Sequence, residues 1–128
     1  MGLSNTRNIL CIDDDPQTLK LRRLLLESAR YGVLTAVSAE EALGLLSEDQ
    51  RIDLILLDFL MPDGRGDEFA RAVKREKPTI PIVVVSAVSA SKLPNEFMQS
   101  VNGYVQKGQP PEVLLDTIAQ VLQATGKC

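Results

Sequence analysis

The chain has 128 residues, of which 45% are hydrophobic and 24% are charged, and its formal net charge is −3. This length fits one domain with its own core, and this composition excludes a disordered or fibrous chain. The basic residues are scattered and interrupted by acidic ones, which argues against direct binding of nucleic acid.

Five short apolar runs alternate with longer segments of helical period. The expected elements are, in chain order, a strand at 8–12, a helix at 16–29, a strand at 33–37, a helix at 39–48, a strand at 52–57, a helix at 65–76, a strand at 80–85, a helix at 92–101, a strand at 103–106 and a helix at 111–124. Such alternation is typical of a parallel sheet with helices on both faces. We therefore predict an α/β fold with a doubly wound, five-stranded parallel sheet and five helices.

The composition of the apolar runs predicts the order of the strands. The runs at 8–12, 52–57 and 80–85 are almost wholly apolar, as strands buried on both faces are. The runs at 33–37 and 103–106 are mixed, which favours the edges of the sheet. With right-handed crossovers, the simplest strand order is 2-1-3-4-5.

Capping signals support several helix ends. Asp15 precedes a proline, and Ser38 is followed three residues later by Glu41, so both positions are typical of helix N-caps. Gly126 stands where a glycine would end the last helix. Pro94 falls inside the fourth predicted helix, which we therefore expect to be short, with this proline in its first turn.

Four of the five predicted strands run into polar residues. These are the acidic run at 13–15, Asp58, Ser86 and Lys107. Each of them alone has an ordinary explanation as a cap, a turn residue or a solvent-facing side chain. In open α/β sheets, however, the ligand site lies beyond the carboxyl ends of the strands. The joint placement of these residues on neighbouring strands therefore predicts a functional site at this edge.

The chain has no histidine, which leaves carboxylates, hydroxyls and lysine for any chemistry. Carboxylates gathered at one sheet edge repel one another unless a cation lies between them, and hard oxygen ligands select Mg²⁺ or Mn²⁺. A divalent ion also offsets the repulsion between a carboxylate and an incoming phosphoryl group. Lys107 and the Ser86 hydroxyl are placed to bind phosphoryl oxygens. This set therefore predicts phosphoryl transfer to a carboxylate.

Four motifs in this order resemble the receiver domains of two-component signalling systems. The family's first strand and acidic pair are similar to ILCIDDDP in this chain. Its D-x-x-M-P-x-x-x-G spacing is matched within LILLDFLMPDGRG at Asp58, Met61, Pro62 and Gly66. The serine–alanine pair is found in IPIVVVSA, and an aromatic residue precedes the lysine by three positions in GYVQK. The resemblance covers essentially the whole chain and implies a flavodoxin-like fold.

The resemblance implies a role for each aspartate at 13–15 and for Asp58. It makes Asp58 the phosphoacceptor and a metal ligand, and it makes Asp14 a direct ligand of Mg²⁺. Asp13 would act on the metal mainly through water, and the main-chain carbonyl of Leu60 would complete the protein's share of the ligands. Asp15 is expected instead to cap the first helix, because the acidic pair directly follows the strand.

The resemblance assigns the other polar residues to phosphoryl binding and to switching. Lys107 matches the family's phosphoryl-binding lysine, and Ser86 with Tyr104 matches its switch pair. Phosphorylation is expected to switch the surface formed by the fourth helix, the fifth strand and the fifth helix. Gly108 departs from the family pattern, since a proline commonly follows this lysine. That departure puts in doubt the cis peptide often found there, but not the role of the lysine.

Two other functions stay open at this point. A phosphohydrolase of the haloacid-dehalogenase type also uses a strand-end aspartate with Mg²⁺, but it needs a second aspartate where this chain has Leu60. An inert, receiver-like interaction module usually lacks part of the acidic, serine and lysine set, which is complete here. We therefore expect a phosphoacceptor that assists its own phosphorylation and dephosphorylation and is not a turnover enzyme.

The resemblance implies that the phosphoryl donor is a sensor histidine kinase or a histidine phosphotransfer protein. The chain is expected to be one receiver domain over residues 1–128, with its core at about 8–125 and no output domain. The stretch KGQPPEVL is more like receivers beside helix-turn-helix output domains, so a stand-alone receiver and a piece of a longer regulator both remain open. The output partner stays unknown, and a homodimer through the fourth helix, fifth strand and fifth helix is a further option.

The location of the protein is inferred from what the sequence does not contain. No apolar run approaches the ~20 residues that a membrane helix needs, and the first residues do not resemble a signal peptide. We therefore expect a cytoplasmic protein without a membrane partner.

Overall fold

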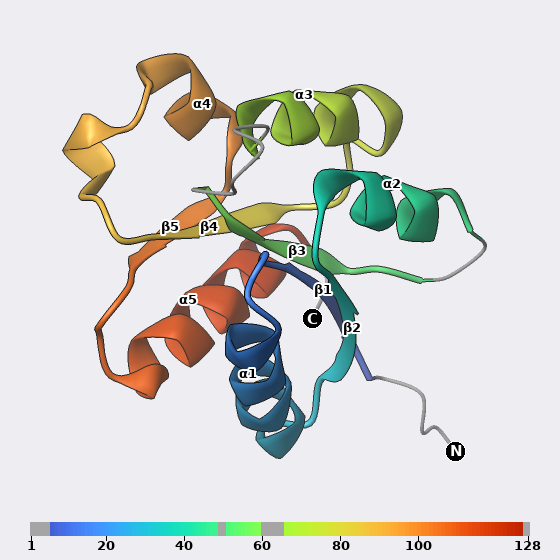
Figure 1. Ribbon diagram of the computed structural model, residues 1–128, viewed down its shortest axis with the longest axis vertical. Coiled ribbons are helices and arrows are strands. Elements are labelled where there is room, and N and C mark those ends of the chain that lie inside the picture. The colour runs from blue at the N-terminus through green and yellow to red at the C-terminus, as the bar shows by residue number, and fades with distance from the viewer. Residues whose placement is uncertain (1–5, 49–50, 60–65, 127–128) are drawn as a thin grey trace.

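The protein forms a five-stranded sheet between two layers of helices (Figure 1). The computed structural model describes residues 6–48, 51–59 and 66–126. Its strand order is β2-β1-β3-β4-β5, and each neighbouring pair is parallel, so the predicted sheet and strand order are confirmed. The elements are β1 (Asn8–Ile12), α1 (Pro16–Ser28), β2 (Gly32–Ala36), α2 (Ala39–Ser47), β3 (Leu54–Asp58), α3 (Gly66–Glu76), β4 (Ile82–Ser86), η1 (Ala90–Lys92), α4 (Asn95–Ser100), β5 (Gly103–Gln106) and α5 (Pro111–Ala124).

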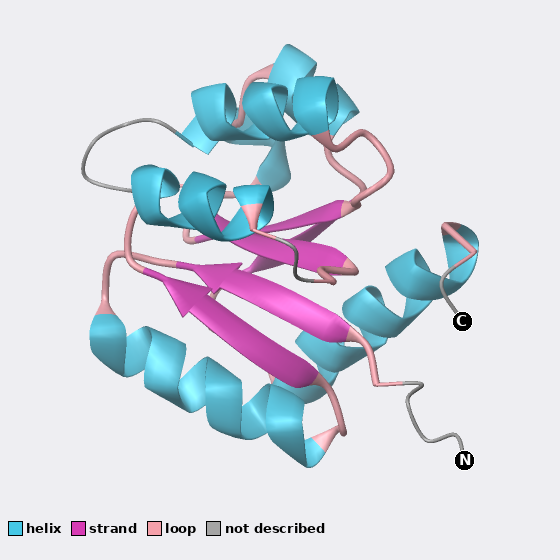
Figure 2. Cartoon of the chain, turned by 90° about the vertical axis from the view of Figure 1, so that its right-hand side faces the viewer, coloured by secondary structure: helices cyan, strands magenta, loops and turns pink. Residues whose placement is uncertain are grey.

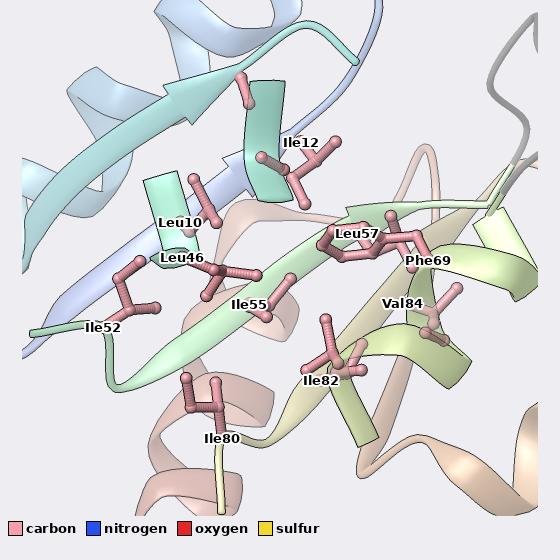
Figure 3. Close-up of a cluster of buried hydrophobic side chains, with 14 of the residues drawn as sticks. Leu10, Ile12, Leu46, Ile52, Ile55, Leu57, Phe69, Ile80, Ile82 and Val84 are labelled. Atoms are coloured by element: carbon pink, nitrogen blue, oxygen red, sulfur yellow. The ribbon is translucent and has the colours of Figure 1, made fainter. Parts of the chain in front are cut away.

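Helices cover both faces of the sheet. The helices α2, α3 and α4 lie on one face, and α1 and α5 lie on the other (Figures 1 and 2). Successive residues of a central strand point to opposite faces, so that Leu56 packs in the α1/α5 layer while Leu57 packs in the α2/α3/α4 layer. Figure 3 shows the second of these clusters, with Leu57 beside Phe69 of α3. Burial on both sides explains why the central strands are continuous apolar runs.

The helices are short and turn one face toward the sheet. The longest described helix, α5, has 14 residues and buries Leu114 and Ile118 against the strands. Within the described ranges, no helix combines the length and the apolar character that crossing a membrane requires.

Two strands begin later than the sequence predicts. The expected strands at 52–57 and 80–85 are found as β3 (Leu54–Asp58) and β4 (Ile82–Ser86). Ile52 and Ile80 are buried in the core although they precede the strands, so their apolar character reflects packing rather than strand pairing. Both strands also extend by one residue, which makes Asp58 and Ser86 the last residues of their strands.

The fourth helix differs most from its prediction. A single helix was expected at 92–101 with Pro94 in its first turn, but the structure has the short turn η1 followed by α4. Pro94 is the N-cap of α4, and Leu93 before it is extended, with φ −90° and ψ 152°. A residue that precedes proline avoids the helical conformation, which separates the two turns.

Side-chain caps fix the starts of α1 and α2 beside the strands. Asp15 caps α1, since its Oδ1 accepts a hydrogen bond from the Gln17 backbone N–H at 3.1 Å. Ser38 caps α2 and accepts from the Glu41 backbone N–H at 3.1 Å, while Glu41 Oε1 accepts from the Val37 N–H at 2.8 Å. The predicted caps are confirmed. In the cap of α2, Glu41 accepts its hydrogen bond from Val37, one residue before the cap, rather than from the backbone N–H of Ser38 itself.

A buried aspartate, Asp53, lies at the amino ends of the strands, and no sequence pattern indicated it. We call its contacts with Asn8 and Arg51 the acidic lock. Asp53 is 4% exposed, and its Oδ2 accepts from the Asn8 backbone N–H at 2.9 Å. Its Oδ1 accepts from Arg51 Nε at 3.0 Å, and its own N–H donates to the Asn8 carbonyl at 2.9 Å. Asp53 therefore joins the starts of β1 and β3, far from the strand ends that carry the predicted site.

Candidate functional site

Three carboxylates meet at the carboxyl ends of β1 and β3. These strands are paired with Ile12 opposite Leu57, which places Asp13 beside Asp58. One carboxylate oxygen from each of Asp13, Asp14 and Asp58 lies within 4.8 Å of the other two. We call these three residues the acidic cluster. Asp13 and Asp58 are buried while Asp14 is exposed, so the acidic cluster opens to solvent on one side. Three hard oxygen ligands at this spacing suit one small divalent cation.

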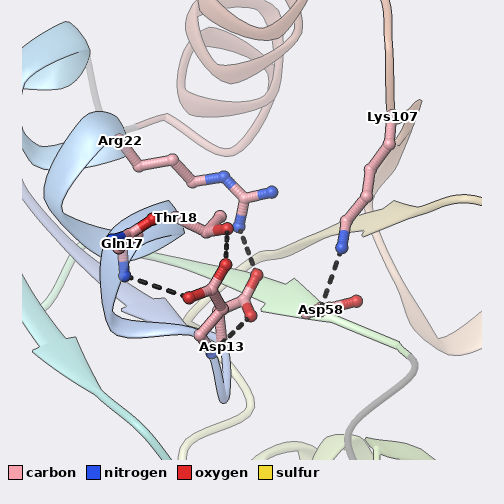
Figure 4. Close-up of polar contacts among 7 residues, drawn as sticks. Asp13, Gln17, Thr18, Arg22, Asp58 and Lys107 are labelled. Carbon is pink, nitrogen blue, oxygen red and sulfur yellow. Dashed lines mark hydrogen bonds and ion pairs between the residues drawn. The ribbon is translucent and has the colours of Figure 1, made fainter.

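Asp13 is held in place by two donors. Its Oδ1 accepts from the Asp15 backbone N–H at 3.0 Å, and its Oδ2 lies 3.3 Å from Arg22 Nη1 (Figure 4). Burial raises the pKa of Asp13, and the Asp58 carboxylate acts in the same direction, while the bond from Asp15 and the charge of Arg22 lower it. Keeping Asp13 ionised therefore costs the fold free energy, which a bound cation would offset.

Asp15 does not belong to this cluster. Its side chain turns back to α1, where Oδ2 accepts from the Thr18 hydroxyl at 2.7 Å and Oδ1 accepts from the Gln17 N–H at 3.1 Å. The bonds from Thr18 and Gln17 lower the pKa of Asp15. This separation of the third aspartate from the acidic pair is the one that the sequence predicts.

Two further strand ends bring a lysine and a serine to Asp58. Lys107 follows β5, and its Nζ lies 3.2 Å from Asp58 Oδ2 (Figure 4). Ser86 ends β4 and is fully buried, and Val85 beside it pairs with Asp58 across the two strands. The Lys107 backbone N–H donates to the Ser86 carbonyl at 2.8 Å, which ties the two strand ends together.

Val88 connects Ser86 to Tyr104. Its backbone N–H donates to Ser86 Oγ at 3.2 Å, and its carbonyl accepts a hydrogen bond from the Tyr104 hydroxyl. Tyr104 is half-buried and packs against the α2/α3/α4 core cluster. The two residues of the predicted switch pair are thus joined through one backbone segment after β4, a link that no sequence pattern indicates.

A second connection runs from the residue after Asp58 to α4. The ring of Phe59 lies against the ring of Phe97, with centroids 4.7 Å apart and planes inclined by 54°. Gly66 begins α3, and a Cβ there would come within 2.8 Å of the Phe59 carbonyl oxygen, so the backbone approach requires glycine. The glycine of the D-x-x-M-P-x-x-x-G motif therefore has a steric reason.

Three residues of the predicted site and its motif fall in the segment 60–65. Leu60, whose carbonyl was expected as a metal ligand, and the motif residues Met61 and Pro62 lie outside the described residues. Gly108 after the lysine has a positive φ of 92°, and no peptide bond among the described residues is cis.

The site resembles the one that the sequence motifs imply, and comparison with known proteins decides the family. Residues 9–119 match the family model described as response regulator receiver domain. The chain belongs to the response regulator receiver family. Among curated relatives, the phosphate regulon transcriptional regulatory protein PhoB of Pseudomonas aeruginosa is 29% identical over 123 residues, which cover 94% of this chain and 53% of the relative. The response regulator SaeR of Staphylococcus aureus is 34% identical over 80 residues, which cover 62% of this chain and 34% of the relative. The receiver chain thus spans about half or less of these relatives.

Solved receivers have the same fold. The chemotaxis response regulator CheY4 of Vibrio cholerae is 29% identical and superposes with a TM-score of 0.83, covering 91% of this chain and 99% of the other. The response regulator TrrA of Thermotoga maritima, solved in complex with Mg²⁺ and BeF, is 29% identical with a TM-score of 0.81, covering 91% and 100%. The predicted flavodoxin-like receiver fold is therefore confirmed.

Proposed function

We propose that this receiver accepts a phosphoryl group on Asp58 in a reaction that depends on Mg²⁺, for which Mn²⁺ can substitute. The observation that carries the proposal is the joint position of Asp58 within the acidic cluster and 3.2 Å from Lys107 Nζ. A divalent ion bound here would supply charge neutralisation between the carboxylate and the incoming phosphoryl oxygens. The solved TrrA receiver, which holds Mg²⁺ and BeF, supports this assignment.

The residues of the chain divide the reaction between them. An Asp58 carboxylate oxygen attacks phosphorus, the bond from phosphorus to the donor breaks, and its electrons leave with acetate or a donor imidazole. Lys107 turns from Asp58 Oδ2 to a phosphoryl oxygen, and the Ser86 hydroxyl donates to another. Both contacts stabilise the charge that spreads over the phosphoryl oxygens in the transition state.

Metal binding is assigned to the acidic cluster. Asp14 and Asp58 would bind Mg²⁺ directly, Asp13 would act through water, and the Leu60 carbonyl would complete the set. The exposed position of Asp14 gives an ion access from solvent, while the buried Asp13 is held by the Asp15 N–H and Arg22. Magnesium retains several waters in proteins, so this small number of protein ligands suffices.

The biological setting follows from the family. We propose a sensor histidine kinase or a histidine phosphotransfer protein as donor, a cytoplasmic location, and a single receiver domain over residues 1–128. The receiver would assist its own phosphorylation and dephosphorylation without being a turnover enzyme. The output partner is left open, because the relatives PhoB and SaeR extend well beyond the matched region.

Intact mass spectrometry after incubation with acetyl phosphate tests the proposal. We expect the parent protein to gain one phosphoryl group in Mg²⁺ and none in excess EDTA. Asp58→Asn is expected to gain none, whereas Asp67→Asn, which removes a half-buried carboxylate from the first turn of α3, should behave as the parent. A mass gain that survives Asp58→Asn, or that forms in EDTA, contradicts the assignment.

The same geometry favours a switch at the face formed by α4, β5 and α5, which is also the face proposed for any homodimer. A phosphoryl group on Asp58 would draw the Ser86 hydroxyl toward it through a charge-assisted hydrogen bond. Ser86 would then release the Val88 N–H and move the carbonyl to which Tyr104 is bonded. The Phe59–Phe97 contact gives α4 a second connection to the site. The hydrogen bond from Ser86 to the phosphoryl group would thereby change the conformation favoured at the face formed by α4, β5 and α5, as a phospho-switch requires.

Amide NMR shifts on addition of Mg²⁺ and beryllofluoride, a phosphoryl mimic, measure this switch. We expect shifts at the strand ends and also at Val88 and across residues 92–106. In Ser86→Ala the active-site shifts should remain while those of α4 and β5 shrink, and Ser89→Ala, whose hydroxyl bonds only to Ser91 in the described structure, is the control. Shifts confined to the acidic cluster in the parent would show that Tyr104 packs identically in both states.

A further inference from the structure

We propose that Arg22 is a built-in counter-cation of the acidic cluster, which stabilises the metal-free receiver and weakens its affinity for Mg²⁺. This inference rests on the proposed function, because it concerns the same metal site. Its starting point is the ion pair at 3.3 Å between Arg22 Nη1 and Asp13 Oδ2. The arginine side chain is 11% exposed and that of Asp13 is 2% exposed, so the pair is poorly screened by solvent.

The position of Arg22 follows from the geometry of α1. Asp15 caps this helix, Thr18 bonds back to the cap, and Arg22 lies one turn beyond Thr18 on the same side. Its guanidinium therefore reaches the end of β1, as Figure 4 shows. The next residue, Arg23, has a side chain that is 41% exposed and pairs with Glu27 at 3.5 Å. Of these two neighbouring arginines, Arg22 pairs with the acidic cluster and Arg23 does not.

The two donors to Asp13 have different consequences for a metal. The Asp15 N–H bond is neutral and orients the carboxylate, whereas the Arg22 pair brings a full positive charge to its other oxygen. A cation beside a divalent ion raises the free energy of the bound state, and the effect is strong where water is largely excluded. Without the metal, the same charge offsets part of the repulsion between Asp13 and Asp58. Arg22 therefore stabilises the metal-free receiver, destabilises the metal-bound receiver, and so reduces the free energy gained on binding the metal.

The surroundings of Arg22 give it somewhere to move. A cavity of about 360 Å³ lies between α1 and the segment after β5, and Arg22 and Lys107 both line it. Leu25 and Pro110 contribute to its apolar wall. When Mg²⁺ binds, the guanidinium can turn from Asp13 toward this cavity and keep its solvent contact. The cost of breaking the ion pair is then the part of the metal affinity that Arg22 removes.

Isothermal titration of the metal-free protein with MgCl₂, together with melting curves in EDTA, tests this role. Arg22→Met should bind Mg²⁺ about three- to tenfold more tightly than the parent and melt at a lower temperature in EDTA. Arg22→Gln keeps an N–H donor on a shorter side chain without the charge, so it should tighten Mg²⁺ binding similarly. Arg22→Lys should restore values close to those of the parent, and Arg23→Met controls for the change in net charge.

The outcomes separate this inference from the proposed function. A parent that shows no Mg²⁺ binding at millimolar concentrations rejects the metal site itself. A parent that binds Mg²⁺, with unchanged or weaker binding in both Arg22→Met and Arg22→Gln, overturns the counter-cation role. Tighter binding in Arg23→Met to the same degree also overturns it, because the effect would then depend on net charge alone.

Discussion

Asp14→Asn is expected to lose Mg²⁺-dependent phosphorylation by at least about 10²-fold, since removing even an outer-shell partner of a metal typically costs 10–100-fold. The same change is expected to raise the melting temperature of the metal-free protein by a few degrees. Asp14 contributes a carboxylate oxygen within 4.8 Å of those of Asp13 and Asp58, so removing its charge relieves repulsion in the folded state. Phosphorylation rates by mass spectrometry and melting curves in EDTA measure the two effects.

Asp15→Asn is the matched control for this prediction. It removes the neighbouring negative charge, but Asp15 caps α1 and does not face the cluster. We expect this variant to keep Mg²⁺-dependent phosphorylation and to gain no stability in EDTA. If Asp14→Asn melts below the parent in EDTA, repulsion does not dominate the metal-free cluster.

Asp53→Ala is expected to destabilise the protein by about 2–3 kcal/mol, which leaves a folded chain with a melting temperature lower by about 10 °C. Its carboxylate is buried and accepts from the Asn8 N–H and from Arg51, so its loss leaves the backbone donor of β1 without its partner. The acidic lock lies at the amino ends of β1 and β3, whereas the acidic cluster lies at their carboxyl ends. Phosphorylation of the folded variant should therefore match that of the parent. Urea unfolding and the acetyl phosphate assay measure the two properties.

Arg51→Ala is the control for the acidic lock. The Arg51 side chain is 61% exposed, and exposed ion pairs contribute about 0–1 kcal/mol, so this variant should unfold close to the parent. Equal destabilisation by Asp53→Ala and Arg51→Ala would show that the ion pair, rather than the bond to the Asn8 backbone, carries the stability.

The sheet could be predicted because its signals are local and repeated. Strands buried on both faces give continuous apolar runs, and the mixed runs at the edges complete the order. The starts of β3 and β4 could not be read in the same way, because Ile52 and Ile80 are as apolar as strand residues but only pack into the core. The break before α4 depends on how Pro94 restricts Leu93, which outweighs the helical pattern around it.

The candidate site could be predicted to the extent that it lies at strand ends. Parallel strands deliver their last residues to one edge, so Asp13, Asp58 and Lys107 were expected together and are found together. Arg22 was missed because it reaches the site from a helix, although its spacing from Asp15 places it on the side of the cap. The link through Val88 was missed because it is made by the backbone N–H and carbonyl, which do not depend on the type of residue at this position.

The most direct test of the central claim is to trap the phosphoryl group chemically and locate it. Borohydride reduces an acyl phosphate to the corresponding alcohol, so a phosphorylated aspartate becomes homoserine, which tandem mass spectrometry can assign to one position. After acetyl phosphate and Mg²⁺ we expect homoserine at position 58, and none in a parallel sample with excess EDTA. Homoserine at position 13 or 14 instead, or equal labelling of position 58 in EDTA, would contradict a metal-dependent phosphoacceptor at Asp58.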